Sequence, residues 1–227
     1  MNQYDTAQPT STEQPSPIVA NTDTAHKAHK TETNHPVRST LSTLGILLLA
    51  PIIAIFLTLF VFQSYQVDGP SMEQTLQNND RLIVWKLPRT WARITSHQYV
   101  PNRGDVIILN ETGLANYGSV DNTKQLVKRV IGLPGDHIVI KDNVLTIYNR
   151  EHPKGFEPDT TLPYGEGGAI PPTTNTLDVT LSSTQLFVCG DNRPNSLDSR
   201  IFGPIETSQV VGKLVARILP LSNTKAF

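Results

Sequence analysis

The hydrophobic residues of this chain are concentrated in one long segment and a series of short ones. The long segment runs from Leu41 to Phe62, and no charged residue occurs from Ser39 through Val67. A helix of this length spans about 33 Å, enough to cross a bilayer core of about 30 Å. A buried soluble helix would be shorter and show a polar face, and a cleaved signal peptide would have a shorter apolar region. The pattern therefore predicts one N-terminal transmembrane helix at residues 39–63.

The segment before this helix, residues 1–38, is rich in Thr, Ser, Gln, Asn, Pro and Ala. Such a composition buries too little apolar surface to offset chain entropy, so we expect a disordered tail. Three basic residues lie in the tail, whereas the first basic residue after the helix is Arg81. The positive-inside rule then places the tail in the cytoplasm and residues 64–227 on the outer face of the cytoplasmic membrane.

The chain after the helix shows short hydrophobic runs that are typical of β-strands. Pro134-Gly135 fits the centre of a type II turn, and Asp142-Asn143 fits a tight hairpin. Residues 149–178 are rich in Pro, Gly and Thr and predict long surface loops. We therefore expect a mostly β, barrel-like antiparallel domain with almost no helix. The predicted strands are residues 81–85, 105–109, 126–131, 138–140, 144–148, 185–189 and 210–218.

Composition narrows the range of functions. The 227 residues carry a net charge of −1, which gives no support for nucleic-acid binding. Cys189 is the only cysteine, so a disulfide within the chain is excluded. Its place in a predicted strand favours its interpretation as a small buried residue of the core. The histidines show no ligand spacing, so we expect no metal. Trp85 and Trp91 are either core residues or residues at the bilayer interface, where Trp is enriched.

Two residues carry candidate chemistry. Ser71 follows a Gly-Pro pair about nine residues after the apolar segment, close to the membrane surface. Lys128 lies in a predicted strand, where alternation places it on the same face as Leu126 and Val130. Its ammonium either reaches water or is desolvated, and desolvation lowers the pKa of a lysine. A lysine that is neutral near pH 7 can serve as general base toward a serine hydroxyl.

A third stretch, residues 190–204, is dense in turn-forming and hydrogen-bonding residues and follows the apolar strand core 186–188 directly. Such a cluster can hold a lysine amine and brace a site with an ion pair. Arg129 faces away from Lys128 in the alternation, and we expect it to be structural.

The order of these motifs resembles bacterial type I signal peptidases, peptidase family S26. The resemblance is carried by Ser-Met…Thr-Leu, Gly-Asp-Val-Ile-Ile, Lys-Arg-Val-Ile-Gly-Leu-Pro-Gly-Asp and Gly-Asp-Asn-Arg-x-x-Ser-x-Asp-Ser-Arg-x-x-Gly. It implies a membrane-bound serine endopeptidase that removes signal peptides from secretory preproteins after small residues at −1 and −3. It also implies a Ser-Lys dyad, a mostly β catalytic domain beside the lipid bilayer, and no metal or cofactor.

Carried over residue by residue, the resemblance assigns the nucleophile to Ser71 and the general base to Lys128. It assigns the orienting of the lysine to Ser196. The Ser71 backbone N–H should serve the oxyanion hole. The remaining supporting residues that it implies are Asp191, and the salt-bridge pair Asp198 and Arg200.

The chain departs from the family pattern at three positions. Gly69 stands where some members have a serine that adds an oxyanion donor, as in single-span members of Gram-positive type. Gln74 replaces the usual proline, and Pro194 replaces a residue that is often polar. The last two changes bear on loop geometry rather than on the dyad.

Two other functions compete with the peptidase. An autocleaving Ser-Lys repressor shares a related β core, but the bilayer-length helix and the missing DNA-binding domain disfavour it. A membrane-anchored, non-catalytic β module that binds exported proteins would have no need of Ser71 and Lys128 together.

Overall fold

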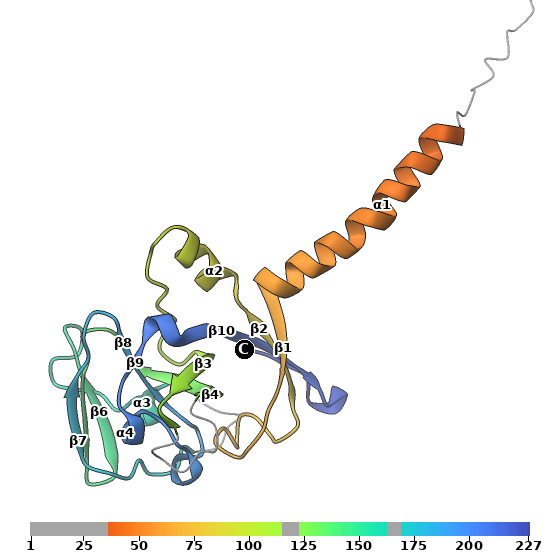
Figure 1. Cartoon of the computed structure of the whole chain (residues 1–227). Coiled ribbons are helices and arrows are strands. Elements are labelled where there is room, and N and C mark those ends of the chain that lie inside the picture. Colours follow the sequence, from red (N-terminus) through yellow and green to blue (C-terminus); the bar gives the residue numbers. More distant parts are fainter. Residues whose placement is uncertain (1–35, 115–122, 163–168) are drawn as a thin grey trace, which may run out of the picture. The chain divides into compact units, whose positions relative to one another are not determined.

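The computed structural model of the protein describes residues 36–114, 123–162 and 169–227 (Figure 1). The disorder predicted for the tail falls on residues 1–38 and so lies almost wholly outside the described residues. The chain divides into two units, Met1–Leu44 and Gly45–Phe227, and the second contains the β structure.

The predicted apolar helix is present with shifted ends. Helix α1 (Pro36–Phe56) runs into a short π-helix, η1 (Leu57–Val61), and strand β1 begins at Phe62, inside the range predicted as helix. The large apolar side chains between Ile46 and Phe60 are exposed. Among the described residues, no helix meets the length and hydropathy that a membrane crossing requires.

The strands form two antiparallel sheets, which confirms the prediction of a mostly β domain. The large sheet has the order β1-β2-β10-β3-β4-β8-β9, with β11 paired to β10, and the small sheet has the order β6-β5-β7. The predicted barrel is not closed in the described part of the chain, because the large sheet ends at β1 and β9. The strands are β1 (Phe62–Gln66), β2 (Arg81–Trp85), β3 (Val106–Thr112), β4 (Thr123–Gly132), β5 (His137–Lys141), β6 (Val144–Tyr148), β7 (Leu177–Thr180), β8 (Gln185–Cys189), β9 (Ile205–Glu206), β10 (Val210–Leu219) and β11 (Lys225–Ala226).

Both predicted turns are confirmed. Asp142 and Asn143 have φ values of 52° and 65°, which suit the two-residue hairpin between β5 and β6. Gly135 has a φ of 85°, and the Asp136 N–H donates to the Leu133 carbonyl at 3.0 Å, as in a type II turn. The region 149–178 is not loop throughout, because it contains α3 (Pro158–Thr161) and the start of β7.

Helix α2 (Leu87–Ile94) corrects the expectation of a domain almost without helix. Pro88 lies in its first turn, where a missing N–H costs nothing. Trp91 is 64% exposed, so it is not a core residue. The other short helical segments are η3 (Arg193–Asn195), α4 (Ser199–Phe202), η4 (Thr207–Gln209) and η5 (Leu221–Asn223).

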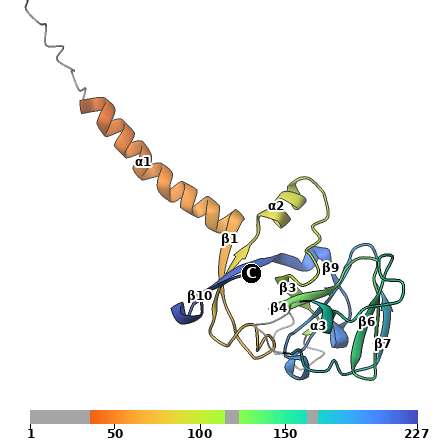
Figure 2. The same ribbon diagram turned by 180° about the vertical axis from the view of Figure 1, so that it is seen from behind.

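Three apolar clusters support the sheets. One joins the small sheet to β8 and includes Cys189, which is fully buried as predicted. A second lies between β3, β4 and β8. The third packs Met72 and Leu76 against β2, β3 and β10, and so fixes the loop that carries Ser71. Figures 1 and 2 show β6 and β7 on the side of the β domain opposite β1.

Candidate active site

Ser71 lies on the loop that joins β1 to β2. The loop is closed at its base, because the Val67 N–H donates to the Asp80 carbonyl at 2.9 Å. Met72 is fully buried beneath the turn, while Ser71 is partly exposed. Gln74, which replaces the usual proline, has a φ of 82°. Proline cannot adopt this value, so the turn here differs from one that a proline would build.

Lys128 contacts Ser71 from strand β4. Its Nζ donates to the Ser71 Oγ at 2.7 Å, and the lysine is only 2% exposed. Burial lowers the pKa of Lys128 to about 8, although the carboxylates of Asp198 and Asp191 act in the opposite direction. The predicted partners are therefore together, and the amine has a pKa within reach of its neutral form near physiological pH.

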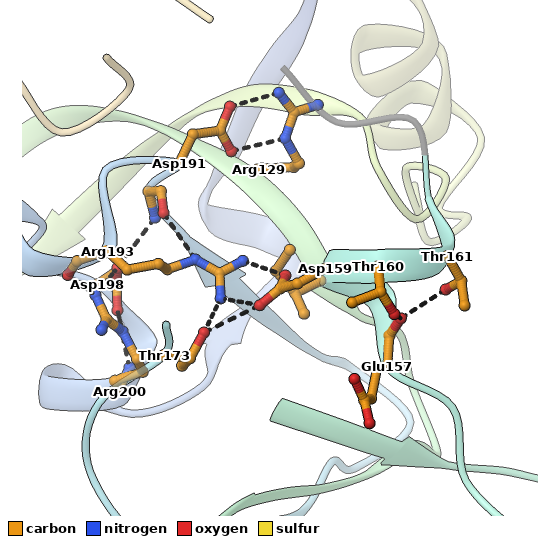
Figure 3. A network of polar contacts seen from close by, with 12 residues as sticks. Arg129, Glu157, Asp159, Thr160, Thr161, Thr173, Asp191, Arg193, Asp198 and Arg200 are labelled. Atoms are coloured by element: carbon orange, nitrogen blue, oxygen red, sulfur yellow. Dashed lines mark hydrogen bonds and ion pairs between the residues drawn. The ribbon is translucent and has the colours of Figure 1, made fainter. Parts of the chain in front are cut away.

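Arg129, the next residue in β4, faces the other way and holds the site together. Its guanidinium donates to the buried Asp191 at 2.8 Å from Nε and 2.6 Å from Nη2. Thr75 Oγ1, from the loop of Ser71, donates to the same carboxylate at 2.5 Å. The Nη1 of Arg129 donates to the Gly104 carbonyl at 2.8 Å. Figure 3 shows the buried pair of Arg129 and Asp191. Together with Thr75, this pair joins β4, the serine loop and the segment after β8.

Asp198 and Arg200 form the predicted ion pair. Arg200 donates to Asp198 at 2.8 Å from both Nε and Nη2, and Asp198 also accepts the Gly190 N–H at 3.0 Å. Burial opposes the ionisation of Asp198, but the hydrogen bonds and the charge of Arg200 outweigh it, so its pKa is lowered. The carboxylate therefore stays charged and fixes the turn that enters α4.

Ser196 is buried, and the predicted hydrogen bond to Lys128 is not among those of the described residues. Its Oγ has no partner at hydrogen-bonding geometry, although it lies near enough to Asp198 to affect that carboxyl. A Cβ at Gly190 would collide with both the Ser196 Oγ and the Ser71 carbonyl. A glycine is required at position 190 because the two serine-bearing segments meet there.

Two further residues reach the site that sequence reasoning did not single out. The Asn192 N–H donates to the Ser71 carbonyl at 3.1 Å, and its side-chain amide donates to the Pro70 carbonyl at 3.1 Å. Arg193, fully buried, donates to the Gly190 carbonyl at 3.0 Å and pairs with Asp159 at 2.5 Å (Figure 3). The density of polar residues at 190–204 pointed to this region, but nothing in the loop-like segment around Asp159 did.

The dyad lies in the wall of a cleft of about 110 Å³. One side of the cleft is the outer half of β4, where residues 123–128 pair with β3 but not with β8. Among the described residues, no group of His, Cys, Asp and Glu is arranged to hold a metal ion. The other residues that line the cleft are Tyr65, Gln66, Val67, Asp68, Leu82, Ile108, Lys124, Gln125, Leu126 and Val127.

Comparison with known proteins identifies the family. Residues 40–219 match the family model described as signal peptidase, peptidase S26. A signal peptidase I of Bacillus caldolyticus is 34% identical over 72% of this chain and 83% of its own. One from Leptolyngbya laminosa is 26% identical over 93% of this chain and 94% of its own. A crystal structure of a signal peptidase I from Enterococcus faecalis matches with a TM-score of 0.36 and 26% identity, over 52% of this chain and 99% of that chain. The chain thus belongs to the signal peptidase family, peptidase S26, and is an enzyme of the serine protease class.

Proposed function

We propose that this enzyme cleaves signal peptides from exported preproteins with Ser71 as nucleophile and Lys128 as general base. The observation that carries the proposal is the 2.7 Å contact between the Ser71 Oγ and the buried Nζ of Lys128. A buried lysine with a lowered pKa is costly to keep in a domain that only binds. Its contact with a serine hydroxyl supports a use in nucleophilic catalysis.

The reaction begins when the neutral Lys128 amine accepts the proton of the Ser71 hydroxyl. The Oγ attacks the scissile carbonyl carbon, and the resulting oxyanion accepts a hydrogen bond from the Ser71 backbone N–H. Lys128 then returns its proton to the leaving amine as the peptide bond breaks, leaving an acyl-enzyme on Ser71. Water attacks this ester with Lys128 again as base, and Lys128 passes the proton taken from water to the Ser71 Oγ as the ester bond breaks. The products are the signal peptide with a new carboxylate and the mature protein with a new amino terminus.

The buried ions act by holding this pair in place. Asp198 fixes the backbone at Gly190, and Asp191 joins the serine loop to β4 through Arg129. We infer that the Ser196 hydroxyl, buried without a partner, turns to the Lys128 amine once the lysine has lost its proton. The Ser196 Oγ then accepts a hydrogen bond from an amine N–H, which leaves the single lone pair of the neutral amine directed at the Ser71 hydroxyl.

The substrate binds in extended form along residues 123–128 of β4, on the edge that pairs with no other strand in the described part of the chain. An unpaired strand edge offers backbone donors and acceptors to an extended peptide, which gives affinity without regard to sequence. The cleft beside Ser71 is small, which favours small side chains at −1 and −3. This arrangement suits a peptidase that must cut many different preproteins at one kind of site.

The apolar segment 39–63 attaches the enzyme to the cytoplasmic membrane, with the N-terminal tail in the cytoplasm and the β domain on the outer face. The exposed apolar side chains from Ile46 to Phe60 support this, because such a surface is unfavourable in water. The basic residues before the segment support the orientation.

The test uses two preproteins that differ only at the cleavage site, one with Ala at −1 and −3 and one with Phe at −1. We expect the full-length enzyme to cut the first at the Ala bond, as seen by mass spectrometry, and to leave the second intact. The Ser71→Ala protein should cut neither. Equal cleavage of both preproteins, or cleavage by Ser71→Ala, would refute the proposal.

A further inference from the structure

Helix α2 is tied to the end of the apolar helix and presents apolar side chains to the outside. The Lys86 N–H donates to the Val61 carbonyl at 2.7 Å, and the Lys86 Nζ donates to the Leu59 carbonyl at 2.9 Å. One turn later, α2 exposes Trp91 and Ile94, the latter by 71%. An exposed tryptophan next to an apolar helix is typical of a residue at the bilayer interface.

The same helix carries cations without acidic partners. Arg89 and Arg93 form no ion pair within the described residues, and neither does Lys86 just before the helix. The Arg89 guanidinium donates to the Ser208 carbonyl at 2.9 Å from Nη2, but its buried Nε has no partner. Burial and the nearby charge of Arg93 both lower the pKa of Arg89. This is a concentration of positive charge that an anion would stabilise.

These groups line one cavity of about 590 Å³. Lys86, Arg89 and Arg93 form its cationic side, and Leu59 and Phe60 of η1 form an apolar side. Of the residues that the structure describes, no Asp or Glu lines it. A phosphate group accepts charge-assisted hydrogen bonds from guanidinium and ammonium groups. It would therefore give the buried Nε of Arg89 a hydrogen-bond acceptor. Leu59 and Phe60, which form the apolar side, are exposed. The acyl chains of a phospholipid could therefore lie along η1.

We propose that this cavity binds the headgroup of an anionic phospholipid, a role separate from peptide cleavage that rests on the proposed membrane attachment. The phosphate lies between Lys86, Arg89 and Arg93, and the acyl chains follow the apolar residues of η1. The exposed apolar side chains of α2, which are Leu87, Trp91 and Ile94, favour a lipid over a soluble phosphate. The bound lipid would hold the β domain against the outer surface of the membrane.

The test measures lipid selectivity of the full-length chain reconstituted in phosphatidylcholine vesicles. Spin-labelled phosphatidylglycerol and spin-labelled phosphatidylcholine are compared by the fraction of each that the protein immobilises. We expect phosphatidylglycerol to associate about thirtyfold more strongly, as two cations at a membrane surface would give. Equal association of the two lipids would overturn the proposed lipid site. Loss of the selectivity on adding millimolar inorganic phosphate would show that the cavity binds a soluble anion instead.

Variants locate the selectivity. Arg89→Gln with Arg93→Gln should abolish the selectivity. Arg93→Gln alone, at an exposed position, should reduce the selectivity about fivefold without disturbing the fold. The matched control, Arg150→Gln with Lys154→Gln, removes the same charge from an exposed loop and should keep it. An equal loss in the control would show a general charge effect and overturn the site.

Two measurements on the same vesicles separate this proposal from the others. Flotation on a density gradient reports membrane attachment, and a chain that does not float would refute the attachment itself. Preprotein cleavage reports the peptidase, and the Arg89 and Arg93 variants should remain active in detergent. A chain that floats and selects phosphatidylglycerol but cuts nothing would sustain the lipid site while refuting the peptidase.

Discussion

Lys128 is the residue on which the proposed chemistry of this enzyme depends. In water a lysine near pH 7 is protonated and cannot accept a proton from a serine. Here the strand places the amine in an apolar wall, and burial lowers its pKa to about 8. Burial of the protonated amine destabilises the fold, and under the proposed mechanism the same burial supplies the base. Both consequences can be measured.

The rate of cleavage should follow the ionisation of Lys128. Because only the neutral amine accepts the Ser71 proton, kcat/KM should rise about tenfold per pH unit below about 8 and level off above it. The measurement is preprotein cleavage between pH 5.5 and 10. Lys128→Arg should be inactive throughout, since arginine stays charged. A rate that falls as the pH rises from 6 to 8 would be incompatible with a lysine base.

The free energy of unfolding should also depend on the ionisation of Lys128, and it should rise with pH. The folded state releases the Lys128 proton near pH 8 and the unfolded state near 10.5, so the unfolded state binds more protons in between and stability rises with pH there. Lys128→Met should be more stable than the wild type by about 3 kcal/mol at pH 7, and this difference should vanish by about pH 10.5.

Urea unfolding at several pH values measures that difference. Lys124→Met is the matched control, because it removes an exposed lysine from the same strand. A constant stability difference between Lys128→Met and the wild type across this pH range would show that Lys128 is not desolvated.

At the scale of elements, buried ion pairs join segments that are far apart in sequence. Arg193 and Asp159 connect the loop after β8 to α3, and the Arg193 side chain has no exposure. Asp159→Asn leaves that guanidinium buried without a counter-ion and should lower the free energy of unfolding by about 3 kcal/mol. The exposed pair of His137 and Asp178 is the control, where Asp178→Asn should cost less than about 1 kcal/mol. Equal losses in the free energy of unfolding of the two variants would show that the buried pair of Arg193 and Asp159 does not stabilise the fold.

The elements that could be predicted from the sequence are those marked by a pattern of neighbouring residues. The Asp142-Asn143 hairpin and the strand around Lys128 follow from turn residues and alternation, and the structure has both. Helix α2 was not predicted because it is only eight residues long, too short for the helical spacing of Leu87, Trp91 and Ile94 to be distinctive. The contact of Arg193 with Asp159 spans 34 positions, and no local pattern encodes it. The pairing of Ser71 with Lys128 was likewise inferred from the family resemblance, not from alternation.

For the molecule as a whole, the account requires the β domain and the N-terminal tail to lie on opposite sides of a membrane. Protease added to spheroplasts should digest the β domain and leave an N-terminal fragment that includes the residues before Arg38. Antibodies to each end of the chain, used on blots before and after lysis, make this measurement. Digestion of the tail with protection of the β domain would reverse the orientation and remove the access to exported substrates.

The central claim is that Ser71 and Lys128 act as one catalytic unit, and a double-mutant cycle on preprotein cleavage tests it most directly. Ser71→Ala and Lys128→Ala should each lower kcat/KM to the background rate, with the folded state unchanged by circular dichroism. The double variant should be no slower than either single one, since a unit that lacks one member has nothing further to lose. A Lys128→Ala protein that still cleaves, or losses that add in the double variant, would contradict the account.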